Sequence, residues 1–358
     1  MNKPIADIHV PKSSTEAPQG AYIDAGLANW GRPTLALALA ERGMDTYFSR
    51  GAQSYDYESG IVSALKPAIR KIEGQYEARV EPVKLAMGSI DAIRNVAAAL
   101  GHGLPELNHP LVRELARDKA ESNRLFQTIE LAKTFALVDP HQGIVPALEA
   151  MPGGSAVLKP RNGRTSQNVY VATKEEIAAI YHSGQLPEDR EWMVEERLDF
   201  SPEIKVTGIN GEEQEKINLL NTLKLPKELR VYTFGRTESD ELIMSFVLRG
   251  AKKGEAMLID DEWIYINPES VPAGVVHGSD KILKALQEKT GVKEVHVAVD
   301  WAYAIKSGEK DPVWLPMEIN GSEPQLVFEN ENQQLAREQA GLLADQLYRI
   351  ASKKGTVN

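Results

Sequence analysis

Near its C-terminal end the chain carries oxygen-bearing side chains whose types and spacing suit a divalent cation. In PMEINGSEP, residues 316–324, Glu318 and Asn320 stand two positions apart, so in a β-strand their side chains share one face. Asp300 is the only acid of an upstream strand-like segment, HVAVDWAYA, and the residues between the two segments are typical of a hairpin loop. Because Mg²⁺ prefers such oxygen ligands, the pattern predicts a metal site at Asp300, Glu318 and Asn320. For each acid alone, a solvated position near a strand edge is the alternative.

A second segment offers groups that bind phosphate. In VLKPRNGRTSQNVYV, Lys159 ends an apolar strand and precedes a polar turn that contains Gly163, Thr165 and Ser166. An ammonium group and the backbone N–H groups of such a turn can face a polyphosphate. A lysine at a strand end also commonly extends its charge into solvent, so this segment alone allows both interpretations.

Further charged residues stand at the ends of apolar runs or inside them. Glu195 and Glu196 follow the apolar run of WMVEERLDFSPE, where an extended segment and a carboxylate could bind the edge of a purine; a solvated acidic turn is the alternative. Arg230 and Arg249 lie on the otherwise apolar segments ELRVYTFG and SFVLRG. Arginine in such a setting usually meets a carboxylate or a phosphate, so a structural ion pair and a phosphate contact both remain open.

The composition excludes several classes of function. The 358 residues exceed the roughly 100 to 200 residues of one domain, so two or three units are expected. The absence of cysteine excludes disulfides, thiolate metal sites and cysteine nucleophiles. A net charge of -10 argues against a general nucleic-acid binder, and no apolar run approaches the ~18 residues that cross a bilayer. The first twenty residues lack the apolar segment of a signal peptide, so we expect a polar lead-in and a cytoplasmic protein.

The elements that must position these residues begin with an α/β pattern over residues 21–110. A strand is followed by a helix from about Pro33 to Gly43 and by a second strand, and a strand at residues 83–87 is followed by a helix from Ile90 to Leu100. Alternating strands and helices predict a parallel sheet. Neither turn carries G-x-G-x-x-G, so the dinucleotide-binding pattern is missing.

The rest of the chain is predicted to be helical at first and then rich in strands. Apolar residues follow a helical period over residues 110–137, and short helices are expected near 174–182 and 279–290 with a closing helix at about 332–352. The polar insertion at residues 207–228 is predicted to be a mobile loop or an extra hairpin. Strands are expected in AVLKP, NVYVAT, WMVEERL, ELRVYTFG, LIMSFVLRG, EWIYI and HVAVDWAYA.

Taken in this order, the segments resemble the ATP-grasp superfamily, in particular its carboxylate–amine ligases such as D-alanine–D-alanine ligases and other amino-acid ligases. The resemblance covers about residues 110–330. It implies an α/β fold class, α+β in the ATP-binding part, in which an N-terminal parallel α/β domain precedes a two-part ATP-grasp fold. The implied parts are a lead-in (1–20), the N-terminal domain (21–110), a central subdomain with the phosphate loop (111–190) and a C-terminal subdomain with the metal site (191–354).

The resemblance also implies ATP and Mg²⁺, or Mn²⁺ in its place, as cofactors. The family's first phosphate lysine corresponds to Lys119 of DKAESNRLF, forty positions before Lys159, and its phosphate-covering loop to residues 162–167. The metal set of the family, Asp and then Glu-x-Asn, falls on the acids and the amide described above.

For the base and the ribose, the resemblance places an adenine hinge at Val194 to Leu198, with Glu195 on the adenine side. One alignment assigns the ribose to Glu203 and another assigns it to Glu228, and both remain open.

Two departures from D-alanine–D-alanine ligases affect specificity. Ala298 stands where those enzymes carry an oxyanion-binding Arg, and NGSEP replaces their N-x-x-P-G loop. The acid and the amine therefore do not carry over from that family, and substrate contacts are expected at Gly321, Ser322 and Glu323.

The resemblance implies an ATP-dependent ligase that joins a carboxylate to an amine, with amino-acid or peptide substrates, through an acylphosphate and with release of ADP and phosphate. Either Arg230 or Arg249 would stabilise the transferring phosphoryl group or the oxyanion. The expected partners are the two small-molecule substrates, with neither nucleic acid nor membrane, and a homodimer is allowed for. The alternatives are an ATP-grasp small-molecule kinase and a non-catalytic nucleotide-binding protein.

Overall fold

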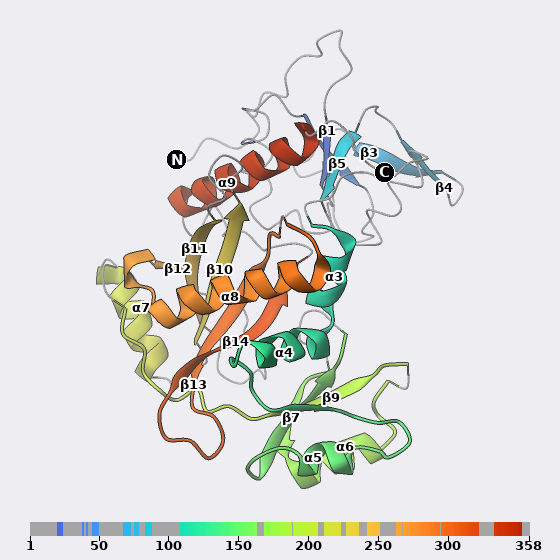
Figure 1. Ribbon diagram of the computed structural model, residues 1–358, viewed down its shortest axis with the longest axis vertical. Coiled ribbons are helices and arrows are strands. Elements are labelled where there is room, and N and C mark those ends of the chain that lie inside the picture. The colour runs from blue at the N-terminus through green and yellow to red at the C-terminus, as the bar shows by residue number, and fades with distance from the viewer. Residues whose placement is uncertain are drawn as a thin grey trace. The chain divides into compact units, whose positions relative to one another are not determined.

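In the computed structural model the described residues form three β-sheets, and the chain divides into two compact units (Figure 1). One unit comprises residues 1–109, 234–243 and 322–358, and the other comprises residues 110–233 and 244–321. The structure describes residues 20–23, 38, 41, 45–49, 67–72, 75–78, 83–87, 108–162, 168–187, 189–206, 211–222, 227–235, 242–250, 263–266, 268–293, 295–321 and 333–352.

The first unit contains a mostly parallel sheet in the order β4-β3-β2-β1-β5. Its strands are β1 (Gly20–Ile23), β2 (Asp45–Ser49), β3 (Pro67–Ile72), β4 (Gln75–Ala78) and β5 (Val83–Met87). β1 pairs in parallel with both β2 and β5, β2 pairs in parallel with β3, and β3 and β4 form an antiparallel hairpin that was not foreseen. Helix α9 (Gln333–Ser352) contacts β5. The helices predicted at 33–43 and 90–100 lie almost wholly outside the described residues.

The second unit begins with two helices and a short strand where one helical stretch over residues 110–137 was predicted. They are α3 (Pro110–Arg117), α4 (Lys119–Thr128) and β6 (Phe135–Leu137). Asp118 separates the helices because it adopts an extended conformation and its carboxylate caps α4, accepting from the N–H groups of Ala120 at 3.0 Å and Glu121 at 3.1 Å. The single long helix was therefore wrong, because an apolar period does not show a cap within it or a strand that pairs elsewhere.

A four-stranded antiparallel sheet has the order β6-β9-β7-β8. Leu158, Trp192 and Val194 of this sheet share a buried core with Leu148 and Ile177, which lie on the two covering helices. The remaining elements of this sheet are β7 (Ser155–Pro160), β8 (Tyr170–Thr173), β9 (Trp192–Glu196), α5 (Val145–Glu149) and α6 (Lys174–His182).

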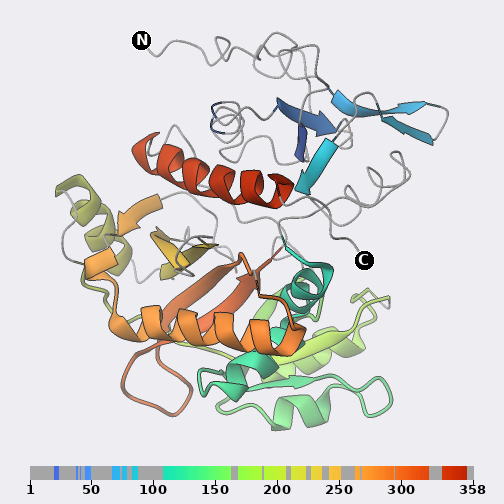
Figure 2. The ribbon, with the colours of Figure 1, turned by 45° about the horizontal axis from the view of Figure 1, so that its top comes forward.

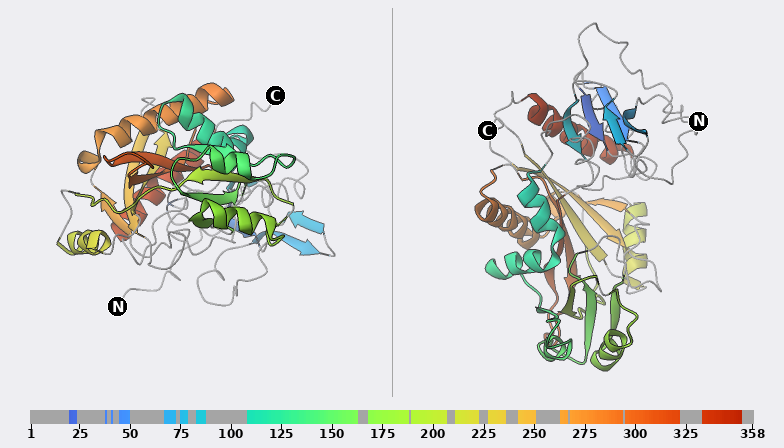
Figure 3. Two further views of the ribbon diagram at one scale, coloured as in Figure 1. Left: turned by 90° about the horizontal axis from the view of Figure 1, so that it is seen from below. Right: turned by 90° about the vertical axis from the view of Figure 1, so that its right-hand side faces the viewer.

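A five-stranded sheet has the order β12-β11-β10-β13-β14, and its pairs β10–β13, β11–β12 and β13–β14 are antiparallel. Its strands are β10 (Lys227–Gly235), β11 (Leu242–Gly250), β12 (Trp263–Ile266), β13 (Ala298–Ala304) and β14 (Val313–Asn320). Helix α8 (Ala273–Thr290) lies across this sheet (Figure 2), and the right-hand view in Figure 3 shows α3 and α4 on the same face. A short 3₁₀ turn, η3 (Pro268–Ser270), precedes α8.

The polar insertion contains a helix, α7 (Gly211–Thr222), and not the loop or hairpin that was predicted. Ile217 and Leu220, three residues apart, are its buried side chains, and its glutamates are good helix formers. The prediction was wrong because the polar composition was taken to indicate irregular structure. Two apolar residues on one face are enough to pack this helix against the rest of the protein.

The observed architecture confirms a mixed helix-and-sheet fold with antiparallel sheets in the part that carries the candidate site. The predicted boundaries at residues 20, 110 and 190 stay predictions. Among the described residues, no helix is both long enough and apolar enough to span a membrane.

Candidate active site

Strands β13 and β14 place the predicted metal ligands beside one another. Asp300 pairs in register with Glu318, and Ala298 pairs with Asn320. Because cross-strand partners share a face, as do residues two apart, the three side chains project from one face of adjacent strands. The amide Nδ2 of Asn320 donates to Oδ2 of Asp300 at 3.0 Å. Asp300 is buried, whereas the side chain of Glu318 is 42% exposed.

Arg230 holds the Asp300 carboxylate from the neighbouring strand β10, where it is the register partner of that residue. Its Nε donates to Oδ1 at 2.6 Å and its Nη2 donates to Oδ2 at 2.8 Å, which makes a buried bidentate ion pair. This geometry corresponds to the ion-pair interpretation of Arg230, and a contact with a phosphoryl group stays a prediction. Arg249 lies opposite Trp263 in the β11–β12 pairing, and its role also stays a prediction.

The donor set fits a hard divalent cation in chemical type, since it consists of two carboxylates and one amide. Both carboxylate oxygens of Asp300 accept hydrogen bonds, Oδ1 from Arg230 and Oδ2 from Arg230 and Asn320. Glu318 is therefore the more open carboxylate, and Asn320 uses its nitrogen toward Asp300, which leaves its oxygen as the ligating end. The described part of the chain contains no group of three or more His, Cys, Asp or Glu side chains suited to a metal. The present set does not count as such a group, because its third donor is the amide of Asn320.

A cluster of lysines lies next to these strands. Lys119, the first residue of α4, has its Nζ 3.9 Å from Oε1 of Glu318. Glu195 of β9 is buried and receives Lys159 on Oε1 at 2.7 Å and Lys133 on Oε2 at 2.8 Å. Three lysines thus face two carboxylates, an excess of positive charge that suits an anionic ligand.

Asn123 of α4 joins the same cluster. Its Nδ2 donates to Oε1 of Glu195 at 3.0 Å and to the carbonyl of Lys119 at 2.8 Å. Its Oδ1 is buried and has no hydrogen-bond partner among the described residues. A buried acceptor therefore stands beside the ion pairs, where a donor group of a bound molecule would satisfy it.

The ion pairs set the pKa values of this cluster. Burial acts to raise the pKa of Glu195, but the charges of Lys133 and Lys159 outweigh burial and lower this pKa to about 2, from an ordinary value of 4.5. Burial lowers the pKa of Lys133, and the carboxylate of Glu195 opposes that shift in part. Burial also lowers the pKa of Lys119, against the opposing charge of Glu318.

The start of α4 is clamped to the end of β7. Arg161 donates through Nε to both carboxylate oxygens of Asp118, at 3.0 and 2.9 Å, and through Nη1 to Glu191 at 2.9 Å. The backbone N–H of Lys119 donates to the carbonyl of Arg161 at 3.1 Å. Burial acts to raise the pKa of Asp118, but the hydrogen bonds from Arg161 and from the α4 backbone lower it overall. The clamp fixes Lys119 relative to the strand that carries Lys159.

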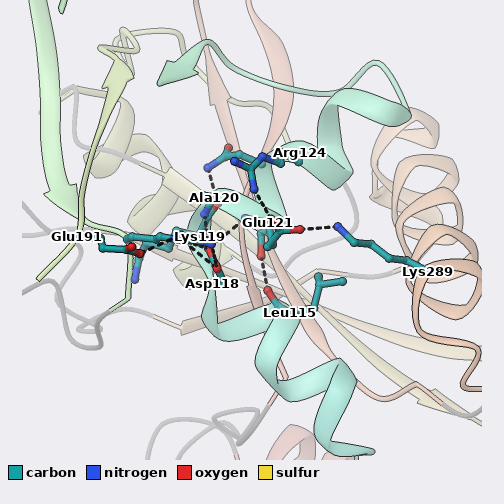
Figure 4. Close-up of polar contacts among 11 residues, drawn as sticks. Leu115, Asp118, Lys119, Ala120, Glu121, Arg124, Glu191 and Lys289 are labelled. Carbon is teal, nitrogen blue, oxygen red and sulfur yellow. Dashed lines mark hydrogen bonds and ion pairs between the residues drawn. The ribbon is translucent and has the colours of Figure 1, made fainter. Parts of the chain in front are cut away.

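Figure 4 shows Asp118 and Lys119 at the first turn of α4, with Glu121 facing Lys289 and Arg124. Glu121 binds Lys289 of α8 at 2.6 Å and also pairs with Arg124. Helix α4 is therefore tied to the four-stranded sheet by Asp118 and to α8 by Glu121.

The predicted hinge, residues 194–198, lies where the four-stranded sheet meets the five-stranded sheet. Leu198 belongs to a small apolar cluster with Ala304 and Leu315, against which Met317 packs. Asp199 and Ile305 exchange backbone hydrogen bonds at 3.0 and 2.9 Å, which ties the segment after β9 to the end of β13. The hinge therefore joins the sheet that carries Lys159 to the sheet that carries the acids.

The other acids predicted to contact the nucleotide differ in burial and in the element that carries them. Glu196 is buried, and its Oε1 accepts from the backbone N–H of Thr134 at 2.6 Å. Glu203 is exposed, and Glu228 lies in β10 opposite Ala302, so the choice between them for the ribose stays open.

Five residues of the predicted phosphate and substrate loops, Gly163, Thr165, Ser166, Ser322 and Glu323, lie outside the described residues. Gly321 is buried against α3, and a Cβ built on it would lie 2.7 Å from the Cβ of Ala116. A glycine at this position lets the end of β14 approach the helix closely.

Sequence reasoning missed Lys133, Asn123 and the clamp made by Asp118 and Arg161. The signals were present but weak, since Lys133 interrupts the apolar run LAKTFAL and Asp118 precedes a helical segment as an N-cap does. The contacts of Lys133 and Asn123 with Glu195, and of Asp118 with Arg161, join segments far apart in the sequence, so no local pattern identifies these partners.

Comparison with known proteins supports the fold. No protein-family model matches the chain, and no curated protein sequence does. Among solved structures, D-alanyl-alanine synthetase A from Vibrio cholerae aligns with a TM-score of 0.60 at 12% identity, over 94% of this chain and 99% of that one. The L-amino acid ligase from Bacillus licheniformis aligns at 0.55 and 12%, over 93% and 75%.

A third similar structure is described as an ATP-grasp protein. The RimK domain protein ATP-grasp from Sphaerobacter thermophilus aligns with a TM-score of 0.52 at 15% identity, over 92% of this chain and 99% of that one. At these identities the likeness concerns the fold, and it agrees with the order of the motifs along the sequence. The chain is therefore a protein of the ATP-grasp fold.

Proposed function

We propose that this protein is an ATP-dependent ligase that joins a carboxylate to an amine, with amino acids or small peptides as substrates. The observation that carries the proposal is the contact of Lys119 with Glu318, at 3.9 Å. It brings a lysine suited to phosphate next to an acid suited to a metal, from elements far apart in the sequence. The similar structures include a D-alanyl-alanine synthetase and an L-amino acid ligase, which supports the same reaction class.

In this proposal the nucleotide lies between the four-stranded and the five-stranded sheet of the second unit. Lys119 and Lys159 neutralise the phosphates, and Asp300, Glu318 and Asn320 hold Mg²⁺, or Mn²⁺ in its place. When bound, the cation supplies charge neutralisation at the β- and γ-phosphates. The buried ion pair with Arg230 orients the carboxylate of Asp300.

The reaction needs positioning and charge neutralisation more than side-chain chemistry. An oxygen of the substrate carboxylate attacks the γ-phosphorus, the bond to the bridging oxygen breaks, and ADP leaves. The amine nitrogen then attacks the carbonyl carbon of the acylphosphate, the carbon–oxygen bond breaks, phosphate leaves, and the nitrogen loses a proton. Arg230 or Arg249 would stabilise the charge that Ala298 cannot. A chain without cysteine is sufficient for this chemistry, since no side-chain nucleophile takes part.

The partners proposed are therefore the two small-molecule substrates. An overall charge of -10 disfavours a nucleic acid as a partner, and the absence of cysteine is compatible with a cytoplasmic location.

A screen of amino-acid pairs for phosphate release, with product masses read by mass spectrometry, tests this function. The expected result is sustained release only when both an acid and an amine are present, with a product mass equal to their sum less one water. Sustained ADP release without any amine would contradict the ligase and indicate a kinase. Nucleotide binding without turnover on every pair would indicate a non-catalytic binder.

Glu318→Gln is the matching variant. Loss of one charge from a metal site should lower turnover by about 100-fold or more, on the scale of losing several kcal/mol of transition-state stabilisation. Folding should be unchanged, because Glu318 is partly exposed and its ion pair is long. Glu309→Gln is the control, since Glu309 is also exposed and its pair with Lys306 has the same length of 3.9 Å. Equal activity of both variants would remove Glu318 from the site.

A further inference from the structure

The two lysines that hold Glu195 differ in their access to a ligand. The side chain of Lys133 is 1% exposed, whereas that of Lys159 is 12% exposed. They occupy different oxygens of the carboxylate, Oε2 for Lys133 and Oε1 for Lys159. Oε1 also accepts from Asn123 at 3.0 Å. If Lys159 moves away, each oxygen of Glu195 therefore keeps one donor.

We infer that Lys133 is a positioning residue for the nucleotide: it is the permanent counter-charge of Glu195 and so allows Lys159 to turn to the phosphates. This inference rests on the proposed function, because it assigns a phosphate ligand to Lys159. Lys133 itself does not reach the phosphates. It acts through the charge balance of a buried carboxylate.

The surroundings of Lys133 keep it in place. Its Nζ lies 3.9 Å from Sδ of Met317, so the ammonium group is enclosed by an apolar side chain of β14 as well as by Glu195. The backbone of the next residue, Thr134, donates to Oε1 of Glu196 and accepts from the N–H of Glu196 at 3.0 Å. Lys133 is therefore fixed by β9 on two sides, while Lys159 ends near the surface of the cluster.

Lys133 decides which counter-charge remains on Glu195 when Lys159 leaves. With Lys133 present, Glu195 retains a full ion pair and the amide of Asn123. Without Lys133, Lys159 is the one ammonium group that remains within ion-pair distance of Glu195 among the described residues, and moving it to a phosphate would leave the buried carboxylate without a direct counter-charge. Breaking a buried pair in this way is strongly unfavourable. Lys159 would then stay with Glu195, and nucleotide affinity would fall.

The test is a double-mutant cycle on nucleotide affinity, measured by calorimetric titration with magnesium and a non-hydrolysable ATP analogue. Lys133→Met should weaken binding by about tenfold or more. A tenfold change in Kd corresponds to about 1.4 kcal/mol of binding free energy. In a Lys159→Met background the same change should alter affinity by less than about twofold, since the residue through which Lys133 acts is gone. Lys174→Met is the control and should bind as the unaltered protein does, because the ammonium group of Lys174 donates to the carbonyl of Met151, away from Glu195.

A second variant covers the case in which Lys133→Met does not fold. In Lys133→Met/Glu195→Gln both charges of the buried pair are removed and Lys159 is no longer held. Because Glu195 is itself a hinge residue, the reference is Glu195→Gln alone, and the two variants should differ in affinity by less than about threefold. A merely structural role for Lys133, or direct contact of Lys133 with the nucleotide, predicts instead that Lys133→Met weakens binding in the Glu195→Gln background as well.

The outcomes separate this inference from the proposed function. If the unaltered protein binds the analogue but the losses from Lys133→Met and Lys159→Met add, the inference is overturned and the proposed function stands. A loss of affinity from Lys133→Met in the Glu195→Gln background as large as in the unaltered protein overturns it as well. If the unaltered protein and the control both fail to bind nucleotide, the proposed function falls and the inference falls with it.

Discussion

At the scale of single residues, the carboxylate of Glu195 makes the stability of the protein depend on pH in the acid range. Its pKa is about 2 in the folded protein, below the ordinary value of 4.5, because Lys133 and Lys159 outweigh the effect of burial. A group whose pKa is depressed on folding contributes stability that is fully present above its unfolded pKa and is lost as the pH falls toward its folded pKa.

We therefore predict that the free energy of unfolding falls between about pH 4.5 and pH 2, with each unit of pKa difference contributing at most about 1.4 kcal/mol. Urea titrations at a series of pH values measure this fall. Lys133→Met/Glu195→Gln, which removes the buried pair without leaving a lone charge, should show a shallower dependence. An equally steep dependence in that variant would assign the acid sensitivity to other carboxylates, among them Asp118, whose pKa is also lowered.

At the scale of elements, helix α8 packs so closely on strand β13 that a glycine is required inside it. A Cβ built on Gly278 would lie 2.4 Å from the Cη2 atom of Trp301 and 3.0 Å from Leu131. Trp301 is fully buried, and its Nε1 donates to Oγ of Ser279 at 3.1 Å, so the indole cannot easily move. The contact holds α8 against the strand that carries Asp300.

Gly278→Ala should therefore destabilise the protein by about 1–3 kcal/mol, although alanine is the better helix former by about 1 kcal/mol. Gly274→Ala in the first turn of the same helix is the control, because nothing lies within 4 Å of its Cβ position. It should be neutral or slightly stabilising. Chemical denaturation of both variants measures the difference, and equal stabilities would mean that Trp301 repacks at no cost.

The elements themselves were predictable to different degrees. Strands β7, β10 and β11 occur within one residue of their predicted segments, because apolar, β-branched and aromatic runs bounded by turn residues indicate strands. Helix α7 and the break at Asp118 were not predicted. In α7 only two apolar positions are buried, and at Asp118 one cap interrupts an apolar period that continues on both sides.

At the scale of the whole molecule, nucleotide binding should couple to global stability. A ligand present at about a hundred times its Kd stabilises the folded state by about 2.7 kcal/mol, provided that it binds only that state. In the proposed function Lys159 contributes to this stabilisation by binding the phosphates, because it is the more accessible of the two lysines paired with Glu195.

We predict that magnesium and ATP raise the Tm by several degrees, and that Lys159→Met reduces this rise while leaving the Tm without nucleotide nearly unchanged. The unliganded variant should stay stable because Glu195 keeps Lys133 and Asn123 as partners. Differential scanning calorimetry with and without nucleotide checks both statements. Lys174→Met serves again as the control, and a full nucleotide-dependent rise in Lys159→Met would exclude Lys159 from phosphate binding.

The sequence alone determined the residue types and the local order of this protein. The spacing of Glu318 and Asn320 on one strand, the strand-ending Lys159 and the order of the segments were sufficient to indicate the fold, because these are properties of neighbouring residues. Their placement on one sheet follows from the hairpin between β13 and β14, which is also local.

Only the tertiary structure decided which charges meet. The pairing of Arg230 with Asp300, of Lys119 with Glu318 and of Lys133 with Glu195 joins elements that are distant along the chain. Such partners are chosen by burial, since a charge removed from water must find a counter-charge among whichever groups the packed sheets and helices bring within reach. That choice depends on the register and packing of the elements, which no local pattern in the sequence encodes.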